Sequence, residues 1–128
     1  MEPCHRPAWL EVDLGAVVHN IRTIKQALGV DIMAIVKANA YGHGAVEVAR
    51  QAMSGGADCL GVARIQEAVA LRQAGIDGRL MVLNYTPPEF SHLALEYDLA
   101  LTVFDVDTAR AISDIAAAAG KRDRKSVV

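Results

Sequence analysis

Aromatic residues and cysteines are scarce in this sequence. Aromatic residues make up 5% of the 128 positions and hydrophobic residues 52%, so the apolar interior must consist mainly of Ala, Val, Leu and Ile, the usual filling of an α/β sheet. Cys4 and Cys59 are the only cysteines. A disulfide between them is an alternative, but the composition is not that of a small secreted scaffold. We therefore interpret Cys59, within an apolar run, as a small buried hydrophobe.

Charge, apolar runs and histidine spacing argue against several further classes of protein. The formal net charge of −2 indicates neither a nucleic acid nor a membrane surface as a partner. No apolar run reaches the length of about 18 residues that a membrane span needs. The start, MEPCHRPAW, lacks the apolar segment of a signal peptide, so we expect a cytoplasmic location. No metal is expected, because no zinc-site spacing relates His5, His19, His43 and His92.

Short apolar runs alternate regularly with amphipathic stretches along the chain. We expect strands at 31–37, 59–63, 79–84 and 99–104, and helices at 14–28, 45–54, 65–74, 87–96 and 107–119. A further short strand, WLEVDL, is expected at 9–14, with Asp13 as the N-cap of the first helix. This alternation predicts a parallel sheet with right-handed crossovers. It does not distinguish half of a TIM-type barrel from a small doubly wound sheet.

The stretch IVKANAYGHG at 35–44 carries the most information about function. Lys37 follows the apolar run IMAIV and precedes two glycines, so we expect it where a buried strand meets its loop. In barrels of alternating strands and helices, that end of the strand carries the chemistry. Lys37 is either a surface lysine with its stem on apolar groups or a lysine that forms a Schiff base with an aldehyde. Spacing alone does not choose between these readings.

The motif VKANAYGHG, together with the N-terminal WLEVDLGAVVHNI, closely resembles the start of alanine racemases. These are pyridoxal-phosphate enzymes of the barrel-type fold. The likeness runs from about Arg6 to about Ala119 and includes ARIQEAVALRQAGI at 63–76 and LTVF at 101–104. It implies an α/β fold, an incomplete TIM-type (β/α) barrel of about four strand–helix units preceded by a short N-terminal strand. Residues 1–122 would form the N-terminal half of the barrel domain.

The resemblance also assigns roles to individual residues. Lys37 would carry pyridoxal 5′-phosphate and act as one of two catalytic bases, with Tyr41 beside the cofactor. Val36 and Leu83 are core residues by default, which we expect on the same sheet face as Lys37, and by resemblance they also touch the cofactor ring. In the family the second base is a different tyrosine, in a C-terminal domain of the partner subunit.

The reaction implied for the parent protein interconverts L-alanine and D-alanine, and D-alanine supplies peptidoglycan synthesis. The substrate is a small-molecule amino acid, and the parent is expected to be a homodimer because each site borrows residues from its partner. One alternative is a racemase for serine or another small amino acid. Others are a non-catalytic pyridoxal-phosphate-binding protein, whose lysine motif is shorter, and a fragment that binds no ligand.

Smaller signals surround the lysine. GHG at 42–44 lacks the third glycine and the Lys-Ser/Thr ending of phosphate loops, so we interpret it as a tight turn, with His43 structural or at the cleft rim. Asn39 either bonds near the site or caps the turn, and we favour the cap. Three residues just beyond the second and third strands are expected at the functional rim: Arg64, Asn84 and Tyr85.

The end of the chain, DRKSVV at 123–128, is also the translation of GATCGGAAGAGCGTCGTG, a segment of a widely used sequencing adapter. We therefore hypothesise that 123–128 is a non-native tail and that the parent continues beyond Arg122. A natural basic C-terminus is the alternative. A half barrel leaves strand edges unpaired, so we expect the isolated chain to be marginal, aggregation-prone or dimeric, and inactive as a racemase.

Overall fold

Five parallel strands form one sheet, and their order in the sheet follows their order in the chain. The structure, a computed structural model, describes residues 8–122 and, by backbone alone, 124–127. Every neighbouring pair of strands is parallel. The strands are β1 (Met33–Ile35), β2 (Cys59–Val62), β3 (Arg79–Val82), β4 (Ala100–Val103) and β5 (Arg124–Val127).

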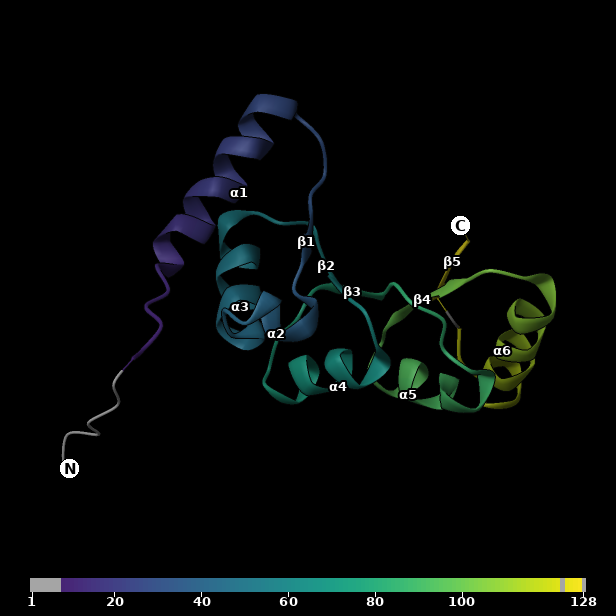
Figure 1. Cartoon of the computed structure of the whole chain (residues 1–128). Helices are drawn as coiled ribbons and strands as arrows, with labels where there is room; N and C mark the ends of the chain where they lie inside the picture. The colour runs from purple at the N-terminus through teal and green to yellow at the C-terminus, as the bar shows by residue number, and fades with distance from the viewer. Residues whose placement is uncertain (1–7, 123, 128) are drawn as a thin grey trace.

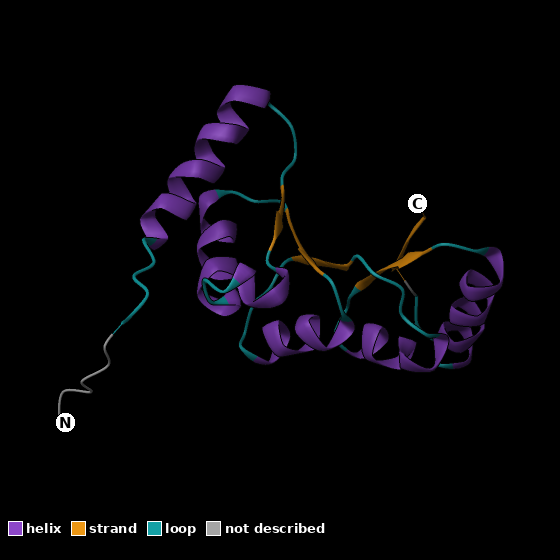
Figure 2. Cartoon of the chain, viewed as in Figure 1, coloured by secondary structure: helices purple, strands orange, loops and turns teal. Residues whose placement is uncertain are grey.

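Helices connect the strands and form an arc around the outside of the sheet (Figures 1 and 2). A doubly wound sheet reverses its strand order at a switch point, whereas this sheet runs without reversal. The incomplete TIM-type α/β barrel is therefore confirmed. The helical segments are α1 (Leu14–Leu28), α2 (Lys37–Tyr41), α3 (Ala45–Gly55), α4 (Ile65–Gln73), the 3-10 turn η1 (Pro88–Phe90), α5 (Ser91–Glu96) and α6 (Val106–Ala118).

The sheet face beneath the helices carries the hydrophobic core. Alternate residues of the inner strands are at most 2% exposed on this face: Leu60, Val62, Leu80, Val82, Leu101 and Val103. Each such side chain contributes about 1.5–3 kcal/mol relative to full exposure. The helices supply the opposing residues, including Leu71 of α4 and Ile112 of α6. The core thus fixes the outer face of the sheet and leaves the inner face to the barrel interior.

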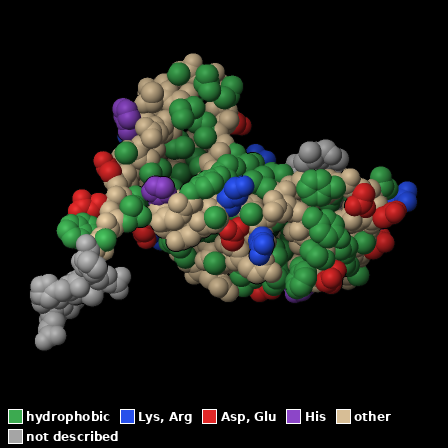
Figure 3. All heavy atoms as spheres, in the orientation of Figure 1, with side chains coloured by type: hydrophobic (Ala, Val, Ile, Leu, Met, Phe, Trp, Pro, Cys, Tyr) green, Lys and Arg blue, Asp and Glu red, His purple; other side chains and the backbone are tan. Residues whose placement is uncertain are grey.

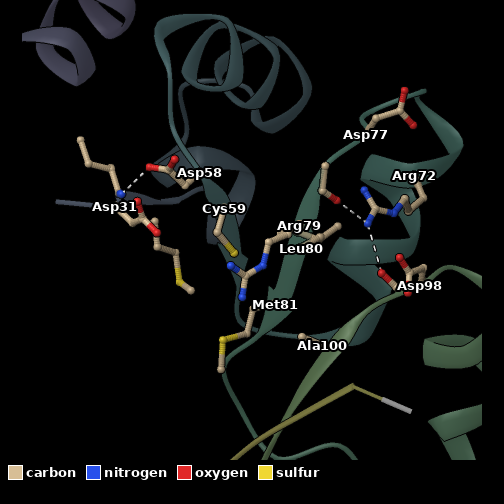
Figure 4. Close-up of a pocket in the computed structure, with 13 residues that line it drawn as sticks. Asp31, Asp58, Cys59, Arg72, Asp77, Arg79, Leu80, Met81, Asp98 and Ala100 are labelled. Carbon is tan, nitrogen blue, oxygen red and sulfur yellow. Dashed lines mark hydrogen bonds between the residues drawn. The ribbon is translucent and has the colours of Figure 1, made fainter. Parts of the chain in front are cut away.

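The inner face of the sheet is open. A cavity of about 850 Å³ lies along it at the amino ends of the strands (Figure 4), lined by side chains that include Met33, Cys59, Arg79 and Met81. Hydrophobic side chains also reach the surface in the hollow beside α1 (Figure 3). This cavity lies at the opposite strand end from Lys37, so we do not take it as the functional site.

Both ends of α1 are fixed by residues next to the helix. The Asp13 carboxylate accepts the backbone N–H groups of Gly15 and Ala16 at 2.9 and 3.2 Å, as an N-cap does. Gly29 ends the helix in the left-handed conformation with φ of 64°. The predicted Asp13 cap is confirmed, and α1 spans the expected residues 14–28.

The predicted N-terminal strand at 9–14 is wrong. Residues 9–13 have no regular secondary structure, and Leu14 begins α1. A strand needs a partner for its backbone groups, and none of the described segments pairs with this one. The Trp9 side chain is 75% exposed, and within the described residues its hydrogen bond is a local one, to Glu11. Alternation of apolar and polar residues did not suffice to form a strand here.

The tail forms a fifth strand that the sequence did not predict. Residues 124–127 pair with Ala100–Val103 of β4, at the position next along the barrel. An exposed strand edge accepts an extended segment through main-chain groups, which depend little on the side chains. Residues 123 and 128 lie outside the described part of the chain, as do Cys4 and His5. The non-native origin of 123–128 stays a prediction.

Two features are absent from the described residues. No helix there is both long enough and apolar enough to cross a membrane. No group of three or more His, Cys, Asp or Glu side chains there is arranged to hold a metal ion.

Candidate active site

Lys37 lies at the carboxyl end of β1, where the backbone hydrogen bonds between β1 and β2 stop. The Val36 N–H still donates to the Gly61 carbonyl at 2.9 Å, and Lys37 then begins α2. The Lys37 side chain is half-buried, and its ammonium makes no hydrogen bond or ion pair within the described residues. The expected place of Lys37 at a strand end is confirmed, and no described residue binds its amine.

The segment after Lys37 is a left-handed turn, which the sequence did not predict. Ala38, Asn39, Ala40 and Tyr41 have φ between 51° and 55°. Left-handed backbone costs about 1–2 kcal/mol for each L-residue, so this turn needs support from its surroundings. Backbone strain of this kind is concentrated at functional sites, where it helps to orient side chains.

Two residues of the lysine motif provide that support. The Asn39 carbonyl oxygen Oδ1 accepts the Ala45 N–H at 2.9 Å, which caps α3. The His43 ring atom Nδ1 lies 2.9 Å from the Ala40 carbonyl oxygen. Both contacts are within or beside the turn. The Asn39 contact agrees with the favoured reading of this residue as a cap of the turn. The His43 contact fits the structural one of the two roles expected for that residue.

Glu67 also holds this turn, and the sequence did not single it out. Its Oε1 accepts the Ala38 N–H at 2.7 Å. Its Oε2 accepts the N–H groups of Ala63 and Arg64 at 2.8 and 2.9 Å. A Glu at the third position of a helix is a recognisable signal for bonding back to the helix start, but nothing in the sequence indicates the contact with Ala38.

An apolar floor lies on the inner face of the sheet beside Lys37. A Cβ atom built on Gly61 would lie 2.7 Å from Cδ1 of Ile35 and 3.4 Å from Cδ1 of Leu83. The side chains of Ile35, Met33 and Leu83 therefore all lie over the bare backbone of Gly61. Leu83 lies on the expected face, and Ile35 was missed.

Val36 does not lie on this face. Its side chain is 1% exposed and belongs to the core cluster under the helices, with Leu60 and Val62. Successive residues along extended chain point to opposite sides, so Val36 and Ile35 cannot share a face. The prediction that Val36 lies on the same face as Lys37 is wrong, and the structure gives its side chain no route to the site.

The remaining predicted residues lie around the same end of the strands. Tyr41 ends the left-handed turn and is 62% exposed. A pocket of about 510 Å³ opens beyond β2, β3 and β4, and its lining includes Arg64, Asn84 and Tyr85 with the aromatic rings of Phe90 and Phe104. The expected rim position of Arg64, Asn84 and Tyr85 agrees with this placement.

The groups whose pKa values are shifted lie away from Lys37. The Lys25 ammonium, which lies 2.7 Å from the Asp58 carboxylate, holds the pKa of Asp58 below its usual value, and the Ile32 N–H acts in the same direction. The backbone N–H and hydroxyl of Thr108 lower the pKa of Asp105. Burial raises the pKa of the Cys59 thiol, which keeps this cysteine in its unreactive form.

This geometry defines part of a parallel (β/α) barrel, with Lys37 at the carboxyl end of β1, the end at which barrels of this kind carry their active sites. Residues 12–126 match the family described as alanine racemase, N-terminal domain. The chain belongs to this family.

Individual relatives agree with that assignment. An alanine racemase of Clostridium perfringens (strain SM101 / Type A) is 43% identical over 95% of this chain and 32% of the relative. The solved alanine racemase of Clostridium difficile 630 superposes with a TM-score of 0.89 at 36% identity, over 94% of this chain and 34% of that one. A Bacillus anthracis alanine racemase, solved with bound L-Ala-P, has a TM-score of 0.79 at 45% identity, over 88% and 30%. The chain thus spans about a third of the length of these relatives.

Proposed function

We propose that this chain is the lysine-bearing part of an alanine racemase and that Lys37 carries pyridoxal 5′-phosphate. The observation that supports this most is the amine of Lys37, which is half-buried at the carboxyl end of β1 and bound by no described residue. Lys25, by contrast, pairs with the carboxylate of Asp58.

The residues around Lys37 fit this cofactor. The apolar floor of Ile35 and Leu83 suits the face of an aromatic ring, and the bare Gly61 leaves the space in which these side chains lie against the sheet. Tyr41 lies one turn after the lysine, with its side chain exposed at the rim. Leu83 thus stays in the proposed cofactor site, and Ile35 takes the place of Val36.

The proposed chemistry assigns one proton transfer to this chain. When bound, pyridoxal phosphate withdraws electrons from the α-carbon of the amino acid. The Nζ atom of Lys37 would exchange the α-proton on one face of the substrate. A base on the opposite face is also required, since racemisation adds a proton on either side of a planar carbon.

We further propose that the parent interconverts L-alanine and D-alanine in the cytoplasm for peptidoglycan synthesis, as a homodimer. The names of the relatives support the alanine assignment. The tail at 123–128 is proposed as non-native. Sequencing across codon 122 in intact source DNA tests this, because a genuine stop codon after DRKSVV would contradict it.

Cofactor uptake tests the central proposal. The purified chain is mixed with pyridoxal phosphate, its absorbance spectrum recorded, and the mixture reduced with borohydride. Peptide mass spectrometry then locates the pyridoxyl group. A spectral band that is lost in Lys37→Ala, with the pyridoxyl group on Lys37, supports the proposal. An equal band in Lys37→Ala, or a label spread evenly over the lysines, contradicts it.

A further inference from the structure

The Glu67 carboxylate joins two strand ends of the barrel. One oxygen accepts the N–H of Ala38, just beyond β1, at 2.7 Å. The other accepts two N–H groups just beyond β2, those of Ala63 and Arg64. All three bonds are charge-assisted and short, the strong class of protein hydrogen bond. We call this set of three bonds the Glu67 clamp.

Capping of α4 accounts for only part of the clamp. Glu67 is the third residue of α4, and its bond to the Arg64 N–H is the usual return bond of such a residue to its own helix start. The bond to Ala38 crosses 29 positions of sequence to another strand end. A cap does not need it.

The Ala38 N–H belongs to the peptide group that leaves Lys37. Fixing that peptide plane fixes ψ of Lys37 and with it the direction in which the side chain of Lys37 departs. Ala38 is also the first residue of the left-handed turn, with φ of 51° and ψ of 49°. The clamp therefore acts where the strained backbone and the proposed cofactor lysine join.

Glu67 does not act on the lysine directly. No ion pair joins the Glu67 carboxylate to the Lys37 ammonium within the described residues. A direct pair would hold the amine in its charged form. The clamp instead binds the backbone N–H of Ala38, the residue after Lys37, and not the lysine amine.

We propose that Glu67 is a positioning residue for Lys37: the Glu67 clamp holds the left-handed turn so that the lysine amine points into the cofactor site. This inference rests on the proposed function of Lys37. It adds a residue outside the lysine motif to the machinery of the site.

Two variants separate positioning from capping. In Glu67→Gln one oxygen is replaced by an NH₂ group, which cannot accept the second set of N–H donors. In Glu67→Asp the charge stays and the local bond to Arg64 can form, but the side chain is one methylene too short to reach Ala38. Glu47→Gln is the matched control, because Glu47 is also the third residue of its helix, is exposed and pairs only with Arg50.

The first readout is the site of pyridoxal-phosphate labelling in the 128-residue chain. After borohydride reduction, the label on Lys37 is divided by the label on Lys121, an exposed internal reference. We expect this ratio to fall about tenfold or more in both Glu67 variants, the loss that one charge-assisted hydrogen bond predicts. Glu47→Gln should leave the ratio unchanged. An unchanged ratio in both folded Glu67 variants would overturn the proposal.

The second readout needs no cofactor. Amide hydrogen exchange, measured by NMR, should show the Ala38 N–H protected in the unmodified chain and exchanging about tenfold faster in Glu67→Gln. If the variants do not fold, the unmodified chain decides: a protected Ala38 amide supports the clamp, and an unprotected one overturns it. If the unmodified chain shows no preference for Lys37 over Lys121, the cofactor proposal fails, and the exchange result still decides the clamp.

Discussion

A Cβ atom on Gly61 would lie 2.7 Å from Cδ1 of Ile35, so these two residues leave no room for a side chain between them. The absence of a side chain at position 61 lets the Ile35 side chain lie against the backbone of β2. A larger residue at position 61 would displace this part of the apolar floor, so we expect its size to affect binding of a ring there.

Gly61→Val should lower both stability and cofactor uptake. Overpacking costs about 1–3 kcal/mol, and the new methyl groups would occupy the space over Ile35 and Leu83. Gly61→Ala is the graded comparison, because its single methyl contacts only the ends of flexible side chains. Urea denaturation and pyridoxal-phosphate titration measure the two effects. Unchanged uptake in a folded Gly61→Val would contradict the placement of the cofactor.

Asn39→Ala should destabilise the chain by about 1–2 kcal/mol. The substitution removes the cap on the Ala45 N–H, which is worth about 1 kcal/mol, and places an unsuited residue at a φ of 55°. Asn39→Asp keeps both an acceptor and tolerance of this conformation, so it should retain most of the stability. Equal unfolding free energies for Asn39→Ala and the unmodified chain would contradict the cap.

Arg72 ties the loops at the amino ends of β3 and β4 together. Its guanidinium donates to the carbonyl oxygens of Tyr97, Ile76, Gly78 and Asp98 at 2.8–3.2 Å, two of them drawn in Figure 4. Arg72→Ala should cost about 2–3 kcal/mol, because it leaves several acceptors unpaired.

Arg110→Ala is the control for Arg72. The Arg110 side chain is exposed and lies 3.9 Å from Asp107, so its removal should change stability by less than about 0.5 kcal/mol. Denaturation curves of the two variants give the comparison. Similar losses in both would show that the carbonyl contacts of Arg72 add nothing.

Acid should weaken the bond between α1 and the start of β2. The pKa of Asp58 is lowered in the folded chain, chiefly by Lys25. A group with a lowered folded pKa stabilises the fold above its unfolded pKa, about 3.9 for Asp. That contribution is lost as the pH falls through the lowered folded value.

The unfolding free energy of Asp58→Asn, compared with the unmodified chain, tests this pH dependence. The difference should be present at neutral pH and shrink as the pH falls below about 4. Asp114→Asn, which changes an exposed carboxylate on α6, should show no such trend. A difference that stays constant down to the lowest pH would contradict the role of the Lys25–Asp58 pair.

The 128-residue chain should take up pyridoxal phosphate without racemising alanine. Racemisation needs a base on each face of the substrate, and Lys37 is proposed to supply one. By family resemblance the other would come from a C-terminal domain of the partner subunit. Chiral chromatography of L-alanine incubated with the loaded chain measures the product. Formation of D-alanine that is lost in Lys37→Ala would contradict this expectation.

Local chemistry determined much of this protein. The apolar runs gave the strands near 33, 59, 79 and 100, and Asp13 and Gly29 bound the first helix through contacts with their immediate neighbours. The lysine motif identified Lys37 and the cap Asn39. These features depend on residues only a few positions apart, so their pattern is legible in the sequence.

Tertiary structure decided the rest. The reading of WLEVDL as a strand failed because no partner strand pairs with it, and the short segment at 124–127 became β5 because β4 offers an edge. Ile35 and not Val36 lies on the face of the proposed site, because the helices cover the face of β1 to which Val36 points. The contact of Glu67 with Ala38 joins residues 29 positions apart. The sequence by itself thus determined four of the five strands, the bounds of the first helix and where the lysine falls. Long-range backbone pairing and packing, which no local pattern encodes, determined how that lysine is held.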